Sequence, residues 1–194
     1  MALTRQDIAR SGLRLLNEVG LNGLTLRLIA SDLGVKAPAL YWHMKNKQEL
    51  LDEMATQMFA DAAASREPPE PLGEWGVVTF RARALRRMML AYRDGGKVFS
   101  GTYLGDIGLV GEHPFRRSID AGLDALRAGR AMFTVYSYVI GFTIEEQAVY
   151  PTPGNRDPRY ADSPAESMFD DVDERFEDGL TMVVLGARQW LDAG

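Results

Sequence analysis

The sequence predicts an all-α protein built from a small helical head and a larger helical domain. Apolar residues recur at helical spacing along most of the 194-residue chain. Glycine- and proline-containing stretches interrupt this periodicity where helices are expected to end. No strand of any length is needed to explain the chain.

The first helix is expected over residues 4–19. Thr4 is a suitable N-cap, Ile8, Leu15 and Leu16 lie on one helical face, and Gly20 ends the helix. A fourth helix is expected from residue 47 or 48 to residues 62–64.

Between them, residues 24–47 have the pattern of a helix-turn-helix. Thr25 can cap a second helix whose small residue Ala30 permits close packing. Gly34 can take the positive φ that the turn needs, and Pro38 suits the first turn of the third helix. The third helix is expected to end near Lys45 and Asn46. A helix-turn-helix of this kind docks in a DNA major groove.

The chain is expected to divide at a hinge. Residues 65–73, SREPPEPLG, contain three prolines and a glycine, which cannot continue a helix. The chain is therefore predicted to divide into an N-terminal domain over 1–64, the hinge, and a larger helical domain over 74–194.

The second domain is expected to contain further helices over 75–92, from about 114 to 128 or 129, over 130–149 and over 170–192. The segment 130–149 is apolar nearly all round, which predicts a helix buried on all sides. Gly179 and Gly186 are seven residues apart and return to nearly the same face of the last helix, which suggests a close helix contact in a homodimer. The predicted homodimer uses the last helix and the 130–149 helix.

Charge and composition restrict the function. The net charge is −5, but residues 25–47 are locally basic, so an acidic body carries a small basic patch. The chain has no cysteine, no leader pattern and no uncharged run longer than 131–144, which is too short to span a bilayer. A cytoplasmic protein with no membrane partner is expected.

Enzymatic chemistry is not expected. The sequence has no spaced His/Glu motif, and neither Gly95-Gly96 nor Gly101 is followed by a lysine at the distance of a phosphate-binding loop. No metal site and no cofactor are predicted. A helical protein with a basic helix-turn-helix could be a ligand-responsive repressor, a helical interaction module, or a DNA-binding protein with a non-ligand regulatory partner. A steep salt dependence of duplex binding would separate a DNA binder from the interaction module.

Three segments carry a family resemblance: LLNEVGLNGLT at 15–25, LGVKAPALYWHMKNKQELLD at 33–52 and YRDGGKVFSGT at 92–102. With the weaker likeness of GFTIEEQ at 141–147, the chain resembles the tetracycline repressor (TetR) family, and its tetracycline-repressor branch in particular, into the C-terminal domain. The resemblance implies a homodimeric, ligand-responsive repressor of a palindromic double-stranded DNA operator, with a small-molecule effector. It also implies that residues 1–64 are the DNA-binding domain and that residues 74–194 are the ligand-binding and dimerisation domain.

The resemblance also implies roles for residues of the head. Arg27 matches the family's guanine-reading arginine, and a guanidinium suits O6 and N7 of guanine. Lys47 and the amides at the start of the fourth helix suit a phosphate. Ala37 and Ala39 replace polar base readers and can only touch a thymine methyl, so a different operator is expected. The predicted DNA-contacting residues are Arg27, Lys36, Ala37, Pro38, Ala39, Tyr41, Trp42, His43 and Lys47.

The expected pocket departs from the family pattern. Ala63 and Phe99 replace a hydrogen-bonding and a metal-binding histidine, Arg81 an asparagine and Tyr103 an arginine. Glu145 alone is a poor magnesium site, so tetracycline is not expected to be sensed by the family's contacts. A flat, multi-ring aromatic effector is expected instead. The predicted ligand-contacting residues are Arg81, Leu85, Met89, Phe99, Thr102, Tyr103, Ser137, Phe142 and Glu145, with Tyr136 nearby in the same lining.

Several charged residues are expected to have no catalytic role. Arg83, Arg86 and Arg87 are interpreted as a solvated face, and Glu145 and Glu146 as solvated or dimer-facing rather than catalytic. Effector binding is expected to reorder residues 95–103, tilt the fourth helix and change the separation of the two recognition helices.

Overall fold

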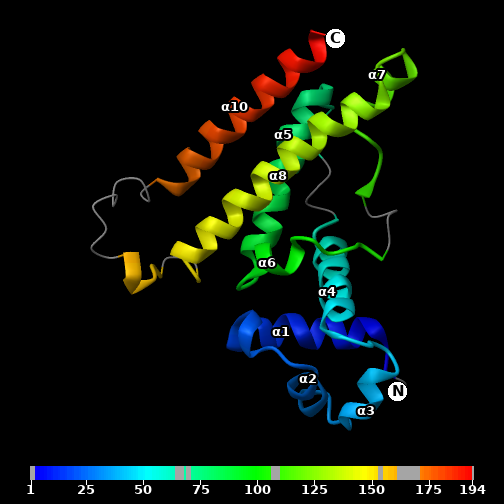
Figure 1. Cartoon of the computed structure of the whole chain (residues 1–194), viewed down its shortest axis with the longest axis vertical. Helices are drawn as coiled ribbons and strands as arrows, with labels where there is room; N and C mark the ends of the chain where they lie inside the picture. Colours follow the sequence, from blue (N-terminus) through cyan, green and yellow to red (C-terminus); the bar gives the residue numbers. More distant parts are fainter. Residues whose placement is uncertain are drawn as a thin grey trace. The chain divides into compact units, whose positions relative to one another are not determined.

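The computed structural model describes residues 3–63, 68, 71–105, 110–152, 155–160 and 171–193. These residues form helices and loops (Figure 1), and the only β pairing among them is an isolated bridge between Thr152 and Asn155. The all-α prediction is confirmed. None of the helices in these ranges is both long and apolar enough to cross a membrane.

The chain forms two compact units, which are described separately below. The first contains Met1–Ala63 and Met88–Leu109, and the second contains Ala64–Arg87 and Val110–Gly194. The grouping differs from the predicted domains in one respect, because residues 88–109 associate with the head. Most of the predicted hinge, residues 65–67, 69 and 70, lies outside the described residues.

The first unit is organised around α1. Thr4 and Asp7 form a reciprocal capping box at its start, in which the Thr4 hydroxyl accepts from the Asp7 amide at 3.1 Å. Ile8 and Leu16 are fully buried on α1, as is Met54 on the facing helix. The helices of this unit are α1 (Arg5–Gly23), α2 (Leu26–Asp32), α3 (Ala37–Tyr41), α4 (Lys47–Asp61) and α6 (Gly95–Phe99).

Two helix ends differ from the predictions. The third helix was expected to reach Lys45 or Asn46, but α3 ends at Tyr41 and Asn46 instead caps α4 by accepting from the Glu49 amide at 2.9 Å. Gly20 interrupts α1, as expected of a helix stop, yet helical residues resume after it and continue to Gly23. The first difference arises from the Asn46 cap, a contact that apolar periodicity does not register. The ends of helices are in any case the least sharply defined part of an assignment.

The second unit contains α5 (Glu74–Leu90) up to Arg87, α7 (Arg116–Asp120), α8 (Ala125–Val149), a 3-10 turn (Pro158–Tyr160) and α10 (Val172–Asp192). The helix expected from about residue 114 to 128 or 129 is interrupted earlier, because Gly122 adopts a φ of +112° between α7 and α8. The break expected near residue 129 is absent, since α8 begins at Ala125 and continues to Val149.

In the second unit α8 packs against α10. The predicted role of Gly179 in a homodimer contact is wrong, because this glycine faces α8 of its own chain. A Cβ at Gly179 would overlap the Tyr138 hydroxyl, which donates to the Phe176 carbonyl at 2.9 Å. Gly186 is exposed, and no described atom lies within 4 Å of its Cβ position.

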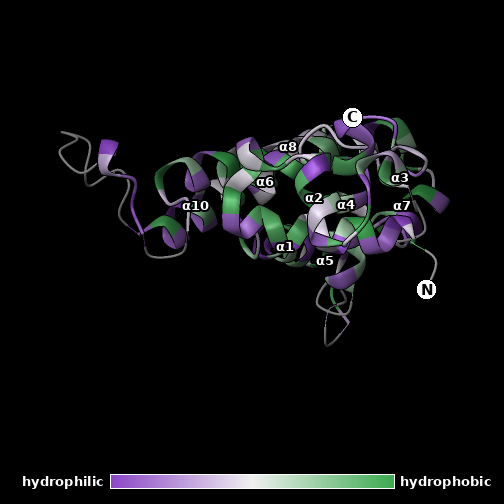
Figure 2. Cartoon of the chain, turned by 90° about the horizontal axis from the view of Figure 1, so that it is seen from below, coloured by the Kyte–Doolittle hydropathy of each residue, from purple (hydrophilic) through white to green (hydrophobic). Residues whose placement is uncertain are grey.

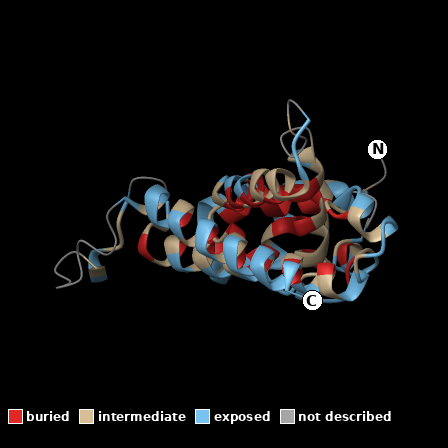
Figure 3. Cartoon of the chain, turned by 90° about the horizontal axis from the view of Figure 1, so that it is seen from above, coloured by how far each residue is buried: buried red, intermediate tan, exposed pale blue. Residues whose placement is uncertain are grey.

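The prediction that residues 130–149 are buried on all sides is also wrong for the single chain. Phe133 is 67% exposed while Val135 and Val139 are buried, so α8 has one inward and one outward face. Figure 2 shows hydrophobic and hydrophilic residues alternating along the helices, and Figure 3 shows buried and exposed residues alternating along the same ribbons. The outward apolar residues of α8 and α10 are Leu126, Phe133, Met182, Leu185 and Trp190.

Candidate nucleic-acid interface and neighbouring sites

The helix-turn-helix is built by a cap, a glycine turn and one buried leucine. Thr25 accepts from the Leu28 amide at 3.1 Å and so starts α2. Gly34 has a φ of +65°, and the Val35 amide then donates to the Ala30 carbonyl at 2.9 Å. Leu40 is fully buried and anchors α3 to the rest of the head. The turn geometry expected at Gly34 is confirmed.

The outer surface of this motif carries large side chains. Trp42 is 88% exposed and Tyr41 is 51% exposed, although an aromatic residue of either type is normally well buried. The short α3 has already used Leu40 for packing, so these neighbours point outward. Of the predicted DNA-contacting residues, the exposed ones are Arg27, Lys36, Pro38, Tyr41, Trp42 and Lys47, and the half-buried ones are Ala37, Ala39 and His43.

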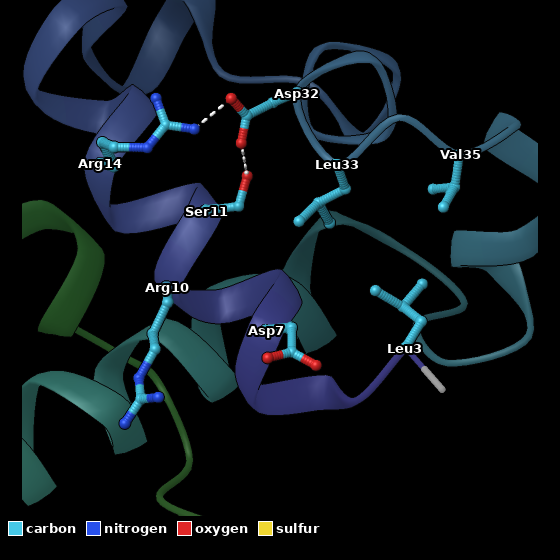
Figure 4. Close-up of a pocket in the computed structure, with 8 residues that line it drawn as sticks. All are labelled: Leu3, Asp7, Arg10, Ser11, Arg14, Asp32, Leu33 and Val35. Atoms are coloured by element: carbon cyan, nitrogen blue, oxygen red, sulfur yellow. Dashed lines mark hydrogen bonds and ion pairs between the residues drawn. The ribbon is translucent and has the colours of Figure 1, made fainter. Parts of the chain in front are cut away.

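The one acidic residue of the motif is neutralised by α1. Asp32 accepts a hydrogen bond from the Ser11 hydroxyl at 2.6 Å and forms an ion pair with Arg14 (Figure 4). The Ser11 hydrogen bond and the Arg14 guanidinium hold the pKa of Asp32 below its usual value. Arg27, Lys36 and Lys47 therefore face solvent without a competing carboxylate from the motif.

The start of α4 provides a second cationic point. The Lys47 ammonium donates to the Leu21 carbonyl at 2.9 Å, and the Lys45 amide donates to the Glu49 carboxylate at 3.0 Å. The Asn46 side chain accepts a hydrogen bond from the Glu49 amide. The Lys47 and Gln48 amides are then the donors at the start of α4 that lack an acceptor within the helix. This arrangement suits a phosphate oxygen at Lys47.

The end of α1 is held by the turn between α5 and α6. The Asp94 carboxylate accepts from the Leu21 amide at 3.0 Å, and the Arg93 amide donates to the Asn17 side chain at 2.9 Å. The Arg93 guanidinium also donates to the Glu18 carbonyl at 3.2 Å. We call these residues of the α5–α6 turn, Arg93 and Asp94, the clamp. Sequence reasoning linked this segment to the head but did not identify the contacts.

Asp94 is under opposing influences. Burial raises its pKa, but the Leu21 amide and the Lys97 ammonium, 3.1 Å away, lower it, and the net direction is downward. A carboxyl whose pKa is lower in the folded state stabilises the fold above its unfolded pKa, and this contribution is lost as the pH falls through the folded pKa. The clamp is therefore expected to weaken in acid.

The predicted ligand-contacting residues fall in both units. Met89, Phe99, Thr102 and Tyr103 belong to the first. Met89 and Phe99 are buried, and the Phe99 ring stacks on Phe59 with 5.8 Å between centroids. Thr102 donates to the Phe99 carbonyl at 2.7 Å, whereas Tyr103 is 76% exposed. The segment after α6 thus presents Tyr103 to solvent and fixes Phe99 inside.

The other predicted ligand-contacting residues belong to the second unit: Arg81, Leu85, Ser137, Phe142 and Glu145. Of these, Phe142 and Glu145 line one cavity of about 130 Å³. Arg81 instead donates to the Glu112 carbonyl at 2.7 Å, and Ser137 is exposed. No group of three or more potential metal-ligating side chains occurs within the described ranges.

The interpretations of Arg86 as solvated and of Glu146 as solvated or dimer-facing are wrong. Both side chains are at most 10% exposed, and they form a bidentate pair with bonds of 2.8 and 2.7 Å. Arg86 also bonds Asp173 at 2.7 Å and lies 4.6 Å from the Phe176 ring centroid. Burial lowers the pKa of Arg86, but these carboxylate partners outweigh it and the net direction is upward. The pair joins α5 to α8 and α10.

A glycine-turned pair of short helices, a solvent-facing Tyr41-Trp42 pair and a cationic rim define a helix-turn-helix DNA-binding regulator. Residues 8–54 match the family described as bacterial regulatory proteins, tetR family, and residues 67–191 match the tetracyclin repressor-like C-terminal domain. The chain belongs to the TetR family, and the predicted resemblance is confirmed in both domains.

Relatives of known function cover nearly the whole chain. The class A tetracycline repressor of transposon 1721 from Escherichia coli is 36% identical over 95% of this chain and 90% of its own length. A TetR variant from Acinetobacter baumannii AYE, solved with minocycline, has a TM-score of 0.78 at 31% identity and covers 97% of this chain and 98% of that one. BioQ solved with its double-stranded DNA operator has a TM-score of 0.70 at 27% identity, over 96% and 98%.

Proposed function

We propose that this chain is a cytoplasmic, homodimeric repressor that binds a palindromic operator and is released by a small, ring-containing molecule. The observation that carries the proposal is the exposed, cationic outer surface of α2 and α3, in which the acidic Asp32 is already paired. The operator-bound BioQ supports the first half of the proposal, binding to DNA, and the minocycline-bound TetR variant supports the second half, release by a small molecule.

The test of the first half is duplex selection from a random library followed by titration at increasing salt. We expect recovery of a palindromic site and a steep fall in affinity with salt, at about one unit of logarithmic slope per phosphate contact. A shallow slope with no enriched sequence would favour the alternative of a helical interaction module.

Arg27→Ala is expected to cost about 1–3 kcal/mol at one base position of each half-site and to relax the preference there. Arg27 is exposed on α2, and a guanidinium can bond both acceptors of a guanine. Binding to the selected operator and to its single-base variants measures this loss. Equal weakening on every sequence would show that Arg27 contacts the backbone and does not read a base.

The homodimer is expected to form through the outward apolar residues of α8 and α10. Leu185 is 59% exposed and lies on the same outward side of α10 as Met182. A groove of about 320 Å³ is lined by residues of both helices, among them Thr134, Gly186 and Trp190. Such a surface on a soluble regulator is suited to a second copy of the same chain.

Leu185→Glu is expected to shift the protein to monomer and to reduce operator affinity, because an unpaired carboxylate would be buried in the dimer. Sedimentation velocity across a concentration series measures the shift. Val110→Glu places the same charge on another exposed apolar residue of the same unit and is expected to leave the dimer intact. A Leu185→Glu protein that remained dimeric would rule out this face.

The effector is proposed to contact the segment after α6, where Tyr103 is exposed four residues after the buried Phe99. A multi-ring aromatic compound at 100 times its dissociation constant should stabilise the protein by about 2.7 kcal/mol. A thermal-shift screen of such compounds, with tetracycline as comparison, measures this effect. Tyr103→Ala should reduce the shift, and a shift unchanged in that variant would place the effector elsewhere.

We further propose that the effector acts on DNA binding through the clamp. Asp94 directly precedes α6, and it holds Leu21 of α1. A ligand that reorders residues 95–103 would therefore displace the end of α1 through the Asp94–Leu21 hydrogen bond and change the position of the helix-turn-helix. A coupling free energy of about 1–3 kcal/mol between effector and operator is expected.

A further inference from the structure

Leu21 is hydrogen-bonded on both sides by residues with different roles. Its amide donates to the Asp94 carboxylate at 3.0 Å, and its carbonyl accepts from the Lys47 ammonium at 2.9 Å. We propose that Leu21 is a relay through which Asp94 positions the Lys47 ammonium for a DNA phosphate. The inference rests on the proposed function, in which Lys47 contacts a DNA phosphate, and it adds that Asp94 controls this contact.

The chain turns sharply at Gly20, immediately before Leu21, and the clamp lies against this turn. Gly20 adopts φ +69° and ψ 174°, a conformation essentially restricted to glycine, and so turns the chain immediately before Leu21. Its Cβ position lies 3.1 Å from the Arg93 side chain and 3.2 Å from the Asp94 carboxylate. The clamp therefore packs directly on the turn that directs the Leu21 carbonyl.

An ammonium group has three donors, so one bond to the Leu21 carbonyl leaves two for a phosphate. Lys47 is exposed, and a lysine side chain loses about 2 kcal/mol of rotamer entropy when it is fixed. Anchoring it before DNA arrives reduces that loss on binding. If Asp94 releases Leu21, the carbonyl is free to turn away and Lys47 loses its anchor.

Asp94 is placed to respond to the effector segment. It occupies the N-terminal cap position of α6 in a left-handed conformation with φ +55°, and its carboxylate pairs with Lys97 inside that helix. Movement of α6 would therefore change the position of the carboxylate that holds Leu21. The relay acts on an electrostatic contact, so it would change the affinity for all DNA sequences alike.

The test uses the full chain and a short mixed-sequence duplex, because a phosphate contact needs no particular sequence. Lys47→Met removes the charge. Asp94→Gly removes the carboxylate and suits the positive φ, whereas Asp94→Asn keeps an oxygen acceptor and tolerates the same φ. Thermal melting of each variant establishes that it is folded, and the slope of log affinity against log salt counts phosphate contacts.

We expect Lys47→Met and Asp94→Gly each to lower the salt slope by about one and the affinity by about tenfold. The double variant should be no weaker than Lys47→Met alone, and Asp94→Asn should retain most of the wild-type slope. Additive losses in the double variant, or a wild-type slope in Asp94→Gly, would overturn the relay. So would an unchanged slope in Lys47→Met.

The two levels of the proposal fail differently. If the wild-type protein shows no salt-dependent binding to duplex, DNA binding itself is excluded and the relay falls with it. If the wild-type protein binds and Lys47→Met lowers the slope while Asp94→Gly does not, DNA binding stands and only the relay is excluded.

Discussion

Replacing Arg86 by methionine is expected to lower the free energy of unfolding by about 3–5 kcal/mol. The substitution leaves the Glu146 carboxylate, 8% exposed, without the guanidinium that bonds both of its oxygens. It also removes a cation that lies 4.6 Å from the Phe176 ring centroid. Urea denaturation at neutral pH measures the loss.

The same helix supplies the control. Arg83 forms a bidentate contact with Glu177, but these side chains are 45% and 43% exposed. Arg83→Met should therefore cost about 0–1 kcal/mol. A double variant, Arg86→Met with Glu146→Leu, removes both buried charges and should recover much of the stability. Similar losses for Arg83→Met and Arg86→Met would show that burial does not determine how much an ion pair contributes to the free energy of unfolding.

The sequence was sufficient for the helical fold because burial follows the 3.6-residue period in most of the chain. The sequence was misleading where a residue contacts a distant part of its own chain, although the local pattern suggests a contact with a second subunit or with solvent. Gly179 looked like a contact between subunits, but the Tyr138 hydroxyl occupies the space beside it. The sequence interpretation placed Arg86 on one solvated face with Arg83 and Arg87. The structure shows Arg83 and Arg87 exposed but Arg86 paired with Glu146, a partner 60 residues away that periodicity cannot indicate.

The candidate DNA interface was more predictable than the effector site. The helix-turn-helix depends on local features, namely the Thr25 cap, the Gly34 turn and the outward Tyr41-Trp42 pair, which lie close together in the sequence. The clamp joins residues 73 positions apart, so no local pattern indicates that Asp94 meets Leu21. One signal was available: an aspartate before two glycines favours a left-handed turn, which frees its side chain for a distant partner.

Gly20→Ala is expected to lower both the stability of the first unit and its affinity for DNA. An alanine at φ +69° and ψ 174° is strained by about 1–3 kcal/mol, and displacing Asp94 from Leu21 costs about a further 1 kcal/mol. The variant should melt earlier and also bind duplex DNA more weakly, because the same methyl group disturbs the clamp.

Gly122→Ala separates the two effects. Gly122 also has a positive φ, +112°, but no described atom lies within 4 Å of its Cβ position, and it belongs to the second unit. Its substitution should lower the melting temperature and leave DNA affinity unchanged. If Gly20→Ala lost stability but bound DNA like the wild-type protein, the end of α1 would serve the fold alone. A loss of affinity confined to Gly20→Ala would instead show that the contact between α1 and the clamp controls the DNA-binding surface.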